Sequence, residues 1–215
     1  MNNKTRQLAI MAMLVAMAYV VGLYRVSFMG AAPFLTYDAK DVIIVLGGLM
    51  FGPVPALMMS VVLAFLEMVT HSQTGLWGMM MNALASATFA CPAAYIYQKS
   101  RNMKGAILGL VAGVVIATGT MLLWNYLVVP FYTGWPRERV ASLILPAFLP
   151  FNLIKTTLNA ALVLLVYKPI TMALKAAKLY NPTQTSTVAG KLNVGIMLVA
   201  AFVVLSLVLL IIVGV

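Results

Sequence analysis

The stretch Pro150-Phe151-Asn152-Leu153-Ile154-Lys155 places an asparagine and a lysine inside an apolar run from Val140 to Tyr167. A charge near the middle of a membrane helix costs about 2.5 to 3.5 kcal/mol on insertion scales, so it faces a bundle interior, a wet cavity or a partner. Lys155 and Asn152 are three residues apart and share a helix face. This face is therefore a candidate ligand-binding surface. The alternative for Lys155 is a structural ion pair with Glu67, which also lies deep in an apolar run.

The composition excludes a water-soluble fold. Of the 215 residues, 63% are hydrophobic and only 8% are charged, which is typical of a polytopic membrane protein. The formal net charge of +10 comes from short basic clusters between apolar runs, the pattern of cytoplasmic membrane loops rather than of a nucleic-acid surface. These clusters are Lys4/Arg6, Lys99/Arg101/Lys104 and Lys168/Lys175/Lys178.

The uncharged run from Val42 to Leu66 is interrupted in its middle by Gly52-Pro53 and Pro55. Because proline removes a helix donor and glycine loosens the backbone, the run predicts two short helices joined by a tight turn. Two spans here bring all the basic clusters to one side, which the positive-inside rule makes cytoplasmic. A re-entrant pair is the alternative. Further spans are predicted within Leu8–Ser27, Ser72–Gln98, Gly105–Pro130 and Val140–Tyr167.

These runs predict an all-α polytopic membrane protein with its N-terminus in the cytoplasm. Residues 1–180 form a six-helix substrate-binding domain, which ends in a basic amphipathic stretch on the cytoplasmic surface. Residues 181–190 read as a linker, and 191–215 as an additional transmembrane helix that places the C-terminus outside. Within the fifth span, Gly105, Gly109 and Gly113 form two G-x-x-x-G steps, which favour close helix contact.

The sequence offers binding chemistry rather than catalysis. It contains neither G-x-x-x-x-G-K-[ST] nor H-E-x-x-H, so ATP-driven work requires a partner. With only four acidic residues, we expect no metal site, no catalytic residue and no cofactor. Buried amides and the lysine can instead recognise a polar ligand, covered by an external loop. The candidate substrate-binding residues are Lys155, Asn152, Asn125, Asn82, Tyr37, Asp38, Asp41 and Glu67.

Three motifs carry a family resemblance: Tyr37-Asp38-Ala39-Lys40-Asp41-Val42 followed by Phe51-Gly52-Pro53, the segment from Asn125-Tyr126 to Pro130, and Leu149-Pro150-Phe151-Asn152-Leu153-Ile154-Lys155. Together they resemble the substrate-binding (S) components of energy-coupling-factor (ECF) vitamin transporters, and most of all the riboflavin-specific branch. The resemblance covers about Leu8 to Lys168. It implies a six-helix bundle that captures riboflavin outside the cell and docks on a transmembrane coupling subunit carrying two ATPases.

The resemblance also assigns Ala12 and Ala16 to the small-residue face that docks on the coupling subunit. The chain departs from the family pattern in two respects. The seventh span is an addition to the basic six helices, and Glu67 stands where we expect related sequences to have a lysine nearby.

Other readings remain open at this point. The vitamin could be pantothenate or folate, since amide and lysine donors do not identify a ring system. A self-sufficient secondary carrier would carry an internal repeat with matching broken helices, but the Gly52-Pro53 break has no counterpart in the second half. A membrane enzyme would use Lys155 as base or nucleophile and would need an adjacent acid, for which only Glu67 is a candidate.

Overall fold

The computed structural model describes residues 3–28, 30, 32, 34–72 and 74–176, together with 201, 202, 204–206 and 208. The predicted linker over 181–190 and most of the predicted final helix lie outside the described residues.

Six helical segments form the described bundle. Five of them are long and apolar enough to cross a membrane: α1, α3, α4, α5 and the continuous segment from α6 to α7. The sixth, α2, is shorter. The predicted all-α fold is confirmed, with a two-stranded hairpin as an unpredicted addition. The elements are α1 Asn3–Gly22, β1 Val26–Ser27, β2 Thr36–Tyr37, α2 Lys40–Phe51, α3 Pro53–Thr70, α4 Gly75–Ser100, α5 Met103–Thr133, α6 Arg137–Leu143, the π-helix η1 Ile144–Phe148 and α7 Leu149–Ala176.

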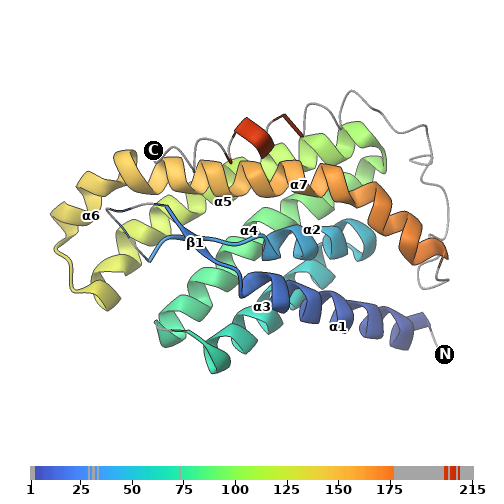
Figure 1. Ribbon diagram of the computed structural model, residues 1–215, viewed down its shortest axis with the longest axis horizontal. Helices are drawn as coiled ribbons and strands as arrows, with labels where there is room; N and C mark the ends of the chain where they lie inside the picture. The colour runs from blue at the N-terminus through green and yellow to red at the C-terminus, as the bar shows by residue number, and fades with distance from the viewer. Residues whose placement is uncertain are drawn as a thin grey trace.

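The break between α2 and α3 lies at Gly52, as the sequence predicts. Gly52 has φ +107°, which glycine adopts without steric cost, and Pro53 then begins α3 without needing a helix donor. Apart from Phe51, every residue of α2 is buried. The helix packs against α1, α3, α4 and α7, and Figure 1 shows it in the interior of the bundle. A helix of only 12 residues is therefore enclosed by longer neighbours.

The glycine steps of α5 lie against α4. A Cβ on Gly109 would approach the carbonyl oxygen of Ala93 to 2.7 Å, and one on Gly113 would approach that of Phe89 to 2.5 Å. The predicted close contact is therefore confirmed, because a larger side chain at either position would push the two helices apart.

The helix that carries Asn152 and Lys155 contains a wide turn. The two prolines of this segment, Pro146 and Pro150, have no N–H to give to the helix. The Leu149 N–H consequently bonds five residues back to Ile144 O. The prolines therefore produce a π-helical turn, and the helix continues through it. The predicted external loop over 133–139 is shorter than expected, because α5 continues to Thr133 and α6 begins at Arg137.

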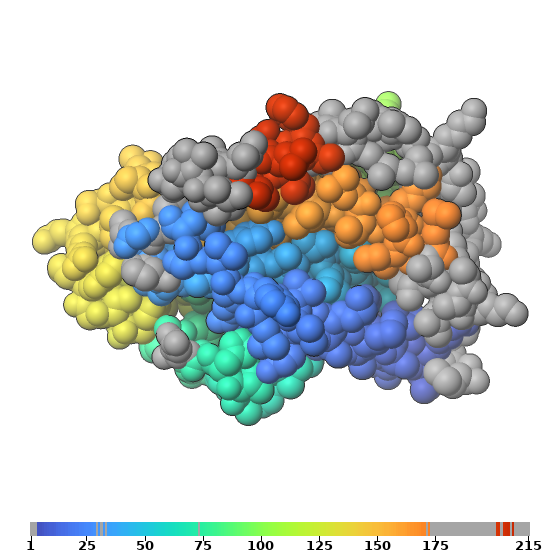
Figure 2. Space-filling view, in the orientation of Figure 1, coloured from blue at the N-terminus to red at the C-terminus, as the bar shows by residue number. Residues whose placement is uncertain are grey.

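The outward faces of the helices are apolar. Leu8 on α1, Val54 on α3, and Leu108 and Phe131 on α5 are each at least 60% exposed. Such exposure suits lipid rather than water. Figure 2 shows α1, in blue, lying along this surface of the molecule.

Candidate ligand-binding site

The β hairpin leads the chain into the site. Val26 pairs with Tyr37 and Ser27 with Thr36 in antiparallel register, and this fixes the start of α2 immediately afterwards. The sequence placed Asp38 and Asp41 on an external loop above the pocket. Lys40 and Asp41 instead form the first turn of α2, and Asp38, Lys40 and Asp41 are 4%, 2% and 4% exposed. A carboxylate in the first turn is favoured by the helix dipole.

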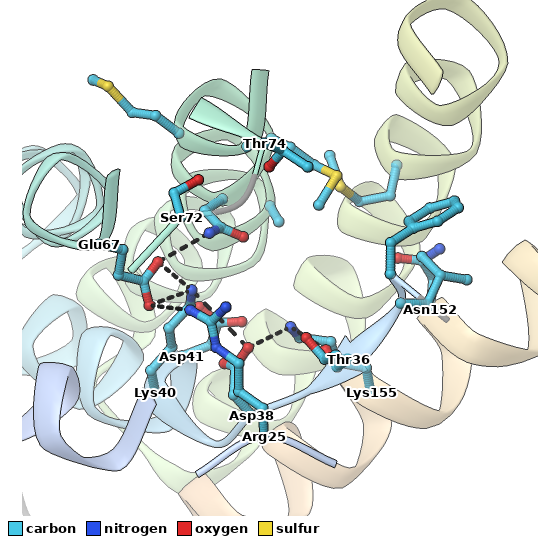
Figure 3. Close-up of a pocket in the computed structure, with 18 of the residues that line it drawn as sticks. Arg25, Thr36, Asp38, Lys40, Asp41, Glu67, Ser72, Thr74, Asn152 and Lys155 are labelled. Atoms are coloured by element: carbon cyan, nitrogen blue, oxygen red, sulfur yellow. Dashed lines mark hydrogen bonds and ion pairs between the residues drawn. The ribbon is translucent and has the colours of Figure 1, made fainter. Parts of the chain in front are cut away.

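A cavity of about 270 Å³ opens between the hairpin, α2, α3, α4, α5 and α7. This is close to the lower end of the size range of small-molecule sites, ~300 to 1,000 Å³. Seven of the eight predicted substrate-binding residues line it, and Figure 3 shows part of this set. They are Asp38, Asp41, Glu67, Asn82, Asn125, Asn152 and Lys155.

Glu67 is the centre of one ion-pair network. Lys40 Nζ donates to both of its carboxylate oxygens, at 2.8 and 2.7 Å. Asn82 Nδ2 donates to Oε2 at 2.9 Å, and Arg25 Nη2 lies 3.5 Å from Oε1. Since Glu67 is 2% exposed, these contacts replace the water that an ionised carboxylate requires.

Lys155 pairs with Asp38 and not with Glu67, the partner that the sequence suggested. Its Nζ donates to Asp38 Oδ2 at 3.1 Å rather than pairing with Glu67. Lys40 Nζ lies 4.0 Å from the same oxygen. Burial alone would raise the pKa of Asp38, but the charges of Lys155 and Lys40 hold it below its ordinary value. Asp38 is therefore ionised at neutral pH.

Two buried acceptors in the cavity wall have no hydrogen-bond partner among the described residues. They are Asp38 Oδ1 and Asn125 Oδ1, and both residues line the cavity. Buried polar atoms are nearly always satisfied, so each such atom requires an explanation. Hydrogen-bond donors on a bound ligand would satisfy both atoms.

The other amides have structural bonds. Asn152 Nδ2 donates to Phe148 O at 2.7 Å. Asn159, 1% exposed, accepts from the Tyr37 hydroxyl at 3.1 Å and donates to Asp38 O at 3.4 Å. Tyr37 is not among the lining residues, and its bond instead ties the hairpin to α7.

Aromatic rings close the end of the cavity nearest the hairpin. Phe34 packs against Tyr132, with ring centroids 5.9 Å apart, and Phe28 against Phe151, at 5.4 Å. Phe34, Tyr132 and Phe151 line the cavity. The site thus combines apolar ring surfaces with hydrogen-bonding groups, as small-molecule pockets do.

The lining residues that were not predicted for the site include Arg25, Lys40 and Thr156. Lys40 belongs to a quoted motif, but a lysine between aspartates outside an apolar run is ordinarily a solvated residue. Its burial depends on Glu67, 27 residues away in the sequence.

A family model of the substrate-specific component of ECF transporters matches residues 6–167. Among curated relatives, the riboflavin transporter FmnP of Bacillus subtilis is 28% identical over 77% of this chain and 94% of its own length. The riboflavin transporter RibU of Staphylococcus aureus is 28% identical over 80% of this chain and 94% of its own. A solved S component of a bacterial ECF transporter superposes with a TM-score of 0.70 at 28% identity, covering 80% of this chain and 99% of that chain.

Proposed function

Because the chain belongs to the substrate-specific components of ECF transporters, we propose that it captures riboflavin from outside the cell for ATP-driven uptake. The chain is a transporter subunit, not an enzyme. The observation that carries the proposal is the cavity of about 270 Å³ inside the helix bundle, in a chain similar to proteins named as riboflavin transporters.

The chemistry of the cavity suits this ligand. Riboflavin has a planar ring with carbonyl and N–H groups and a polyhydroxyl chain. The unpartnered acceptors Asp38 Oδ1 and Asn125 Oδ1 can receive its N–H or hydroxyl donors, and Lys155 and Asn82 supply donors for its oxygens. Phe151 offers an apolar surface to the ring.

Titration with riboflavin tests the proposal directly. The purified protein is expected to quench flavin fluorescence saturably at one ligand per chain, and flavin retained through purification would show in the visible absorption spectrum. Pantothenate and folate are titrated in parallel with thermal stability as readout. No quenching by riboflavin, with stabilisation by either of the other vitamins, would contradict the assignment.

A pair of asparagine variants tests the ligand contacts. Asn125→Ala removes an acceptor with no partner in the described structure, so riboflavin affinity should fall about tenfold, or about 1.4 kcal/mol, for one lost hydrogen bond. Asn159→Ala is the matched control, because its amide bonds within the protein. It should lower thermal stability more than affinity. The reverse pattern would remove Asn125 from the binding site.

We further propose that α1 docks on the transmembrane coupling subunit, which carries the two ATPases. Ala12 and Ala16 are exposed on α1, and this helix lies along the surface in Figure 2. Small side chains allow close approach of a second helix in lipid.

We propose that the N-terminus is cytoplasmic. The start of α1 and the end of α7, which both carry basic residues, lie at the same end of the molecule in Figure 1, which supports this orientation. In a Cys91→Ala background, an impermeant thiol reagent should label Glu138→Cys from outside but not Ser100→Cys. Both native residues are exposed. Labelling of Ser100→Cys alone would reverse the orientation. If 191–215 forms a seventh span, the C-terminus is external.

A further inference from the structure

The charges that line the cavity cancel. Three acidic and three basic side chains belong to its wall, so their formal sum is zero. The acidic residues are Asp38, Asp41 and Glu67, and the basic ones are Arg25, Lys40 and Lys155. A ligand that enters this cavity meets cations only in the company of carboxylates.

Glu67 engages two of the three cations. Lys40 donates to both carboxylate oxygens within 2.8 Å, and Arg25 Nη2 approaches Oε1 to 3.5 Å. Figure 3 shows these contacts converging on the carboxylate. With Lys155 bonded to Asp38 at 3.1 Å, each cation that lines the cavity already faces a carboxylate.

The remaining lining groups add no positive charge at neutral pH. Arg25 Nη2 lies 2.6 Å from His71 Nε2. Because a guanidinium can only donate, that nitrogen must accept, as it does in neutral imidazole. The pKa of His71 is lowered by its partial burial and then by the charge of Arg25. Asp41 accepts a hydrogen bond from Ser86 and is one of the three acidic residues already counted.

We infer that Glu67 makes this site selective for an uncharged ligand, by engaging the two cations that would otherwise receive a phosphate or carboxylate. The inference rests on the proposed function and deepens it. A phosphorylated ligand would bring an uncompensated charge into a buried, neutral site, which is strongly disfavoured. Riboflavin should therefore bind more tightly than riboflavin 5′-phosphate, which differs from it only in the charged group.

The test is the ratio of the dissociation constant of riboflavin 5′-phosphate to that of riboflavin, measured at pH 7.5, where the phosphate is mostly dianionic. The wild-type ratio should be at least about ten, and Glu67→Gln should lower it at least about tenfold by releasing Arg25 and Lys40. Arg25→Gln, with the opposite change of charge, should raise the ratio. The double variant should return it to within about threefold of the wild type.

The control is Glu138→Gln, which makes the same change of net charge at an exposed position outside the cavity. Its ratio should equal that of the wild type. A wild-type ratio near one, or equal effects of Glu67→Gln and Glu138→Gln, would overturn the inference while leaving riboflavin binding intact. A double variant with a ratio as high as that of Arg25→Gln alone would also overturn it, because Arg25 would then contact the phosphate directly.

Arg25→Gln and the double variant still test the inference if Glu67→Gln alone does not fold. Arg25→Gln changes a side chain that is 31% exposed, and the double variant keeps the charges in balance. Riboflavin affinity of each variant reports whether its site is intact. A wild-type protein that binds no riboflavin would overturn the proposed function and this inference together.

Discussion

Replacing Lys155 with Met measures how strongly the ion pair in the cavity wall stabilises the fold. Lys155 Nζ lies 3.1 Å from Asp38 Oδ2, and the side chain of Asp38 is 4% exposed. The substitution leaves this carboxylate with Lys40 at 4.0 Å. Removing one partner of a buried ion pair costs about 3 to 5 kcal/mol. Because Lys40 remains near and the side chain of Lys155 is 15% exposed, we expect a loss near the lower limit, about 3 kcal/mol.

The assay is the free energy of unfolding in detergent micelles, without ligand. Adding Asp38→Asn to Lys155→Met should recover most of the loss, because no unpaired carboxylate then remains. Adding Glu67→Gln should recover nothing, since Glu67 is held by Lys40 at 2.7 Å. Equal recovery by the two second substitutions, or no loss in Lys155→Met itself, would refute the assignment of the pair.

Three further predictions concern docking, pH and packing. Replacing Ala12 and Ala16 with Leu should abolish uptake by cells but leave riboflavin affinity unchanged; loss of both would mean that these alanines only pack the bundle. Because the pKa of His71 is lowered in the fold by partial burial and a neighbouring guanidinium, the unfolded chain binds this proton more tightly. The folded protein therefore loses stability as the pH falls below 6.5 toward the lowered pKa of His71, and it loses none from this group above pH 6.5. On acidification, the thermal midpoint of unfolding should fall less in His71→Gln than in the wild type. Gly109→Ala should cost about 1 to 3 kcal/mol of unfolding free energy through contact with the α4 backbone. Gly119→Ala, on the same helix with nothing within 4 Å, should not destabilise.

The sequence predicts those features that depend on local chemistry. Gly52 and Pro53 break the helix through their own backbone properties, whatever the tertiary fold. The three-residue spacing of Asn152 and Lys155 puts both on one helix face. The pairing of charges could not be predicted in this way. Lys155 bonds Asp38 across 117 positions, and only the folded hairpin brings that carboxylate to α7. The burial of Lys40 was missed for the same reason.

The π-helical turn at Ile144–Phe148 tolerates a change of length that the regular helix after it does not. An α-helix advances about 100° per residue, and the wide turn accommodates one residue more than an α-helical path would. Deleting a single residue there would let the helix close into a regular α-helix, and α7 would keep its orientation relative to α6. Deleting a residue between Leu149 and Asn152 would instead rotate everything after it by about 100°, and Lys155 would turn from the cavity toward a neighbouring helix or lipid. Functional homologues should therefore include single-residue gaps at the π-helical turn but not in the helical turn that follows it.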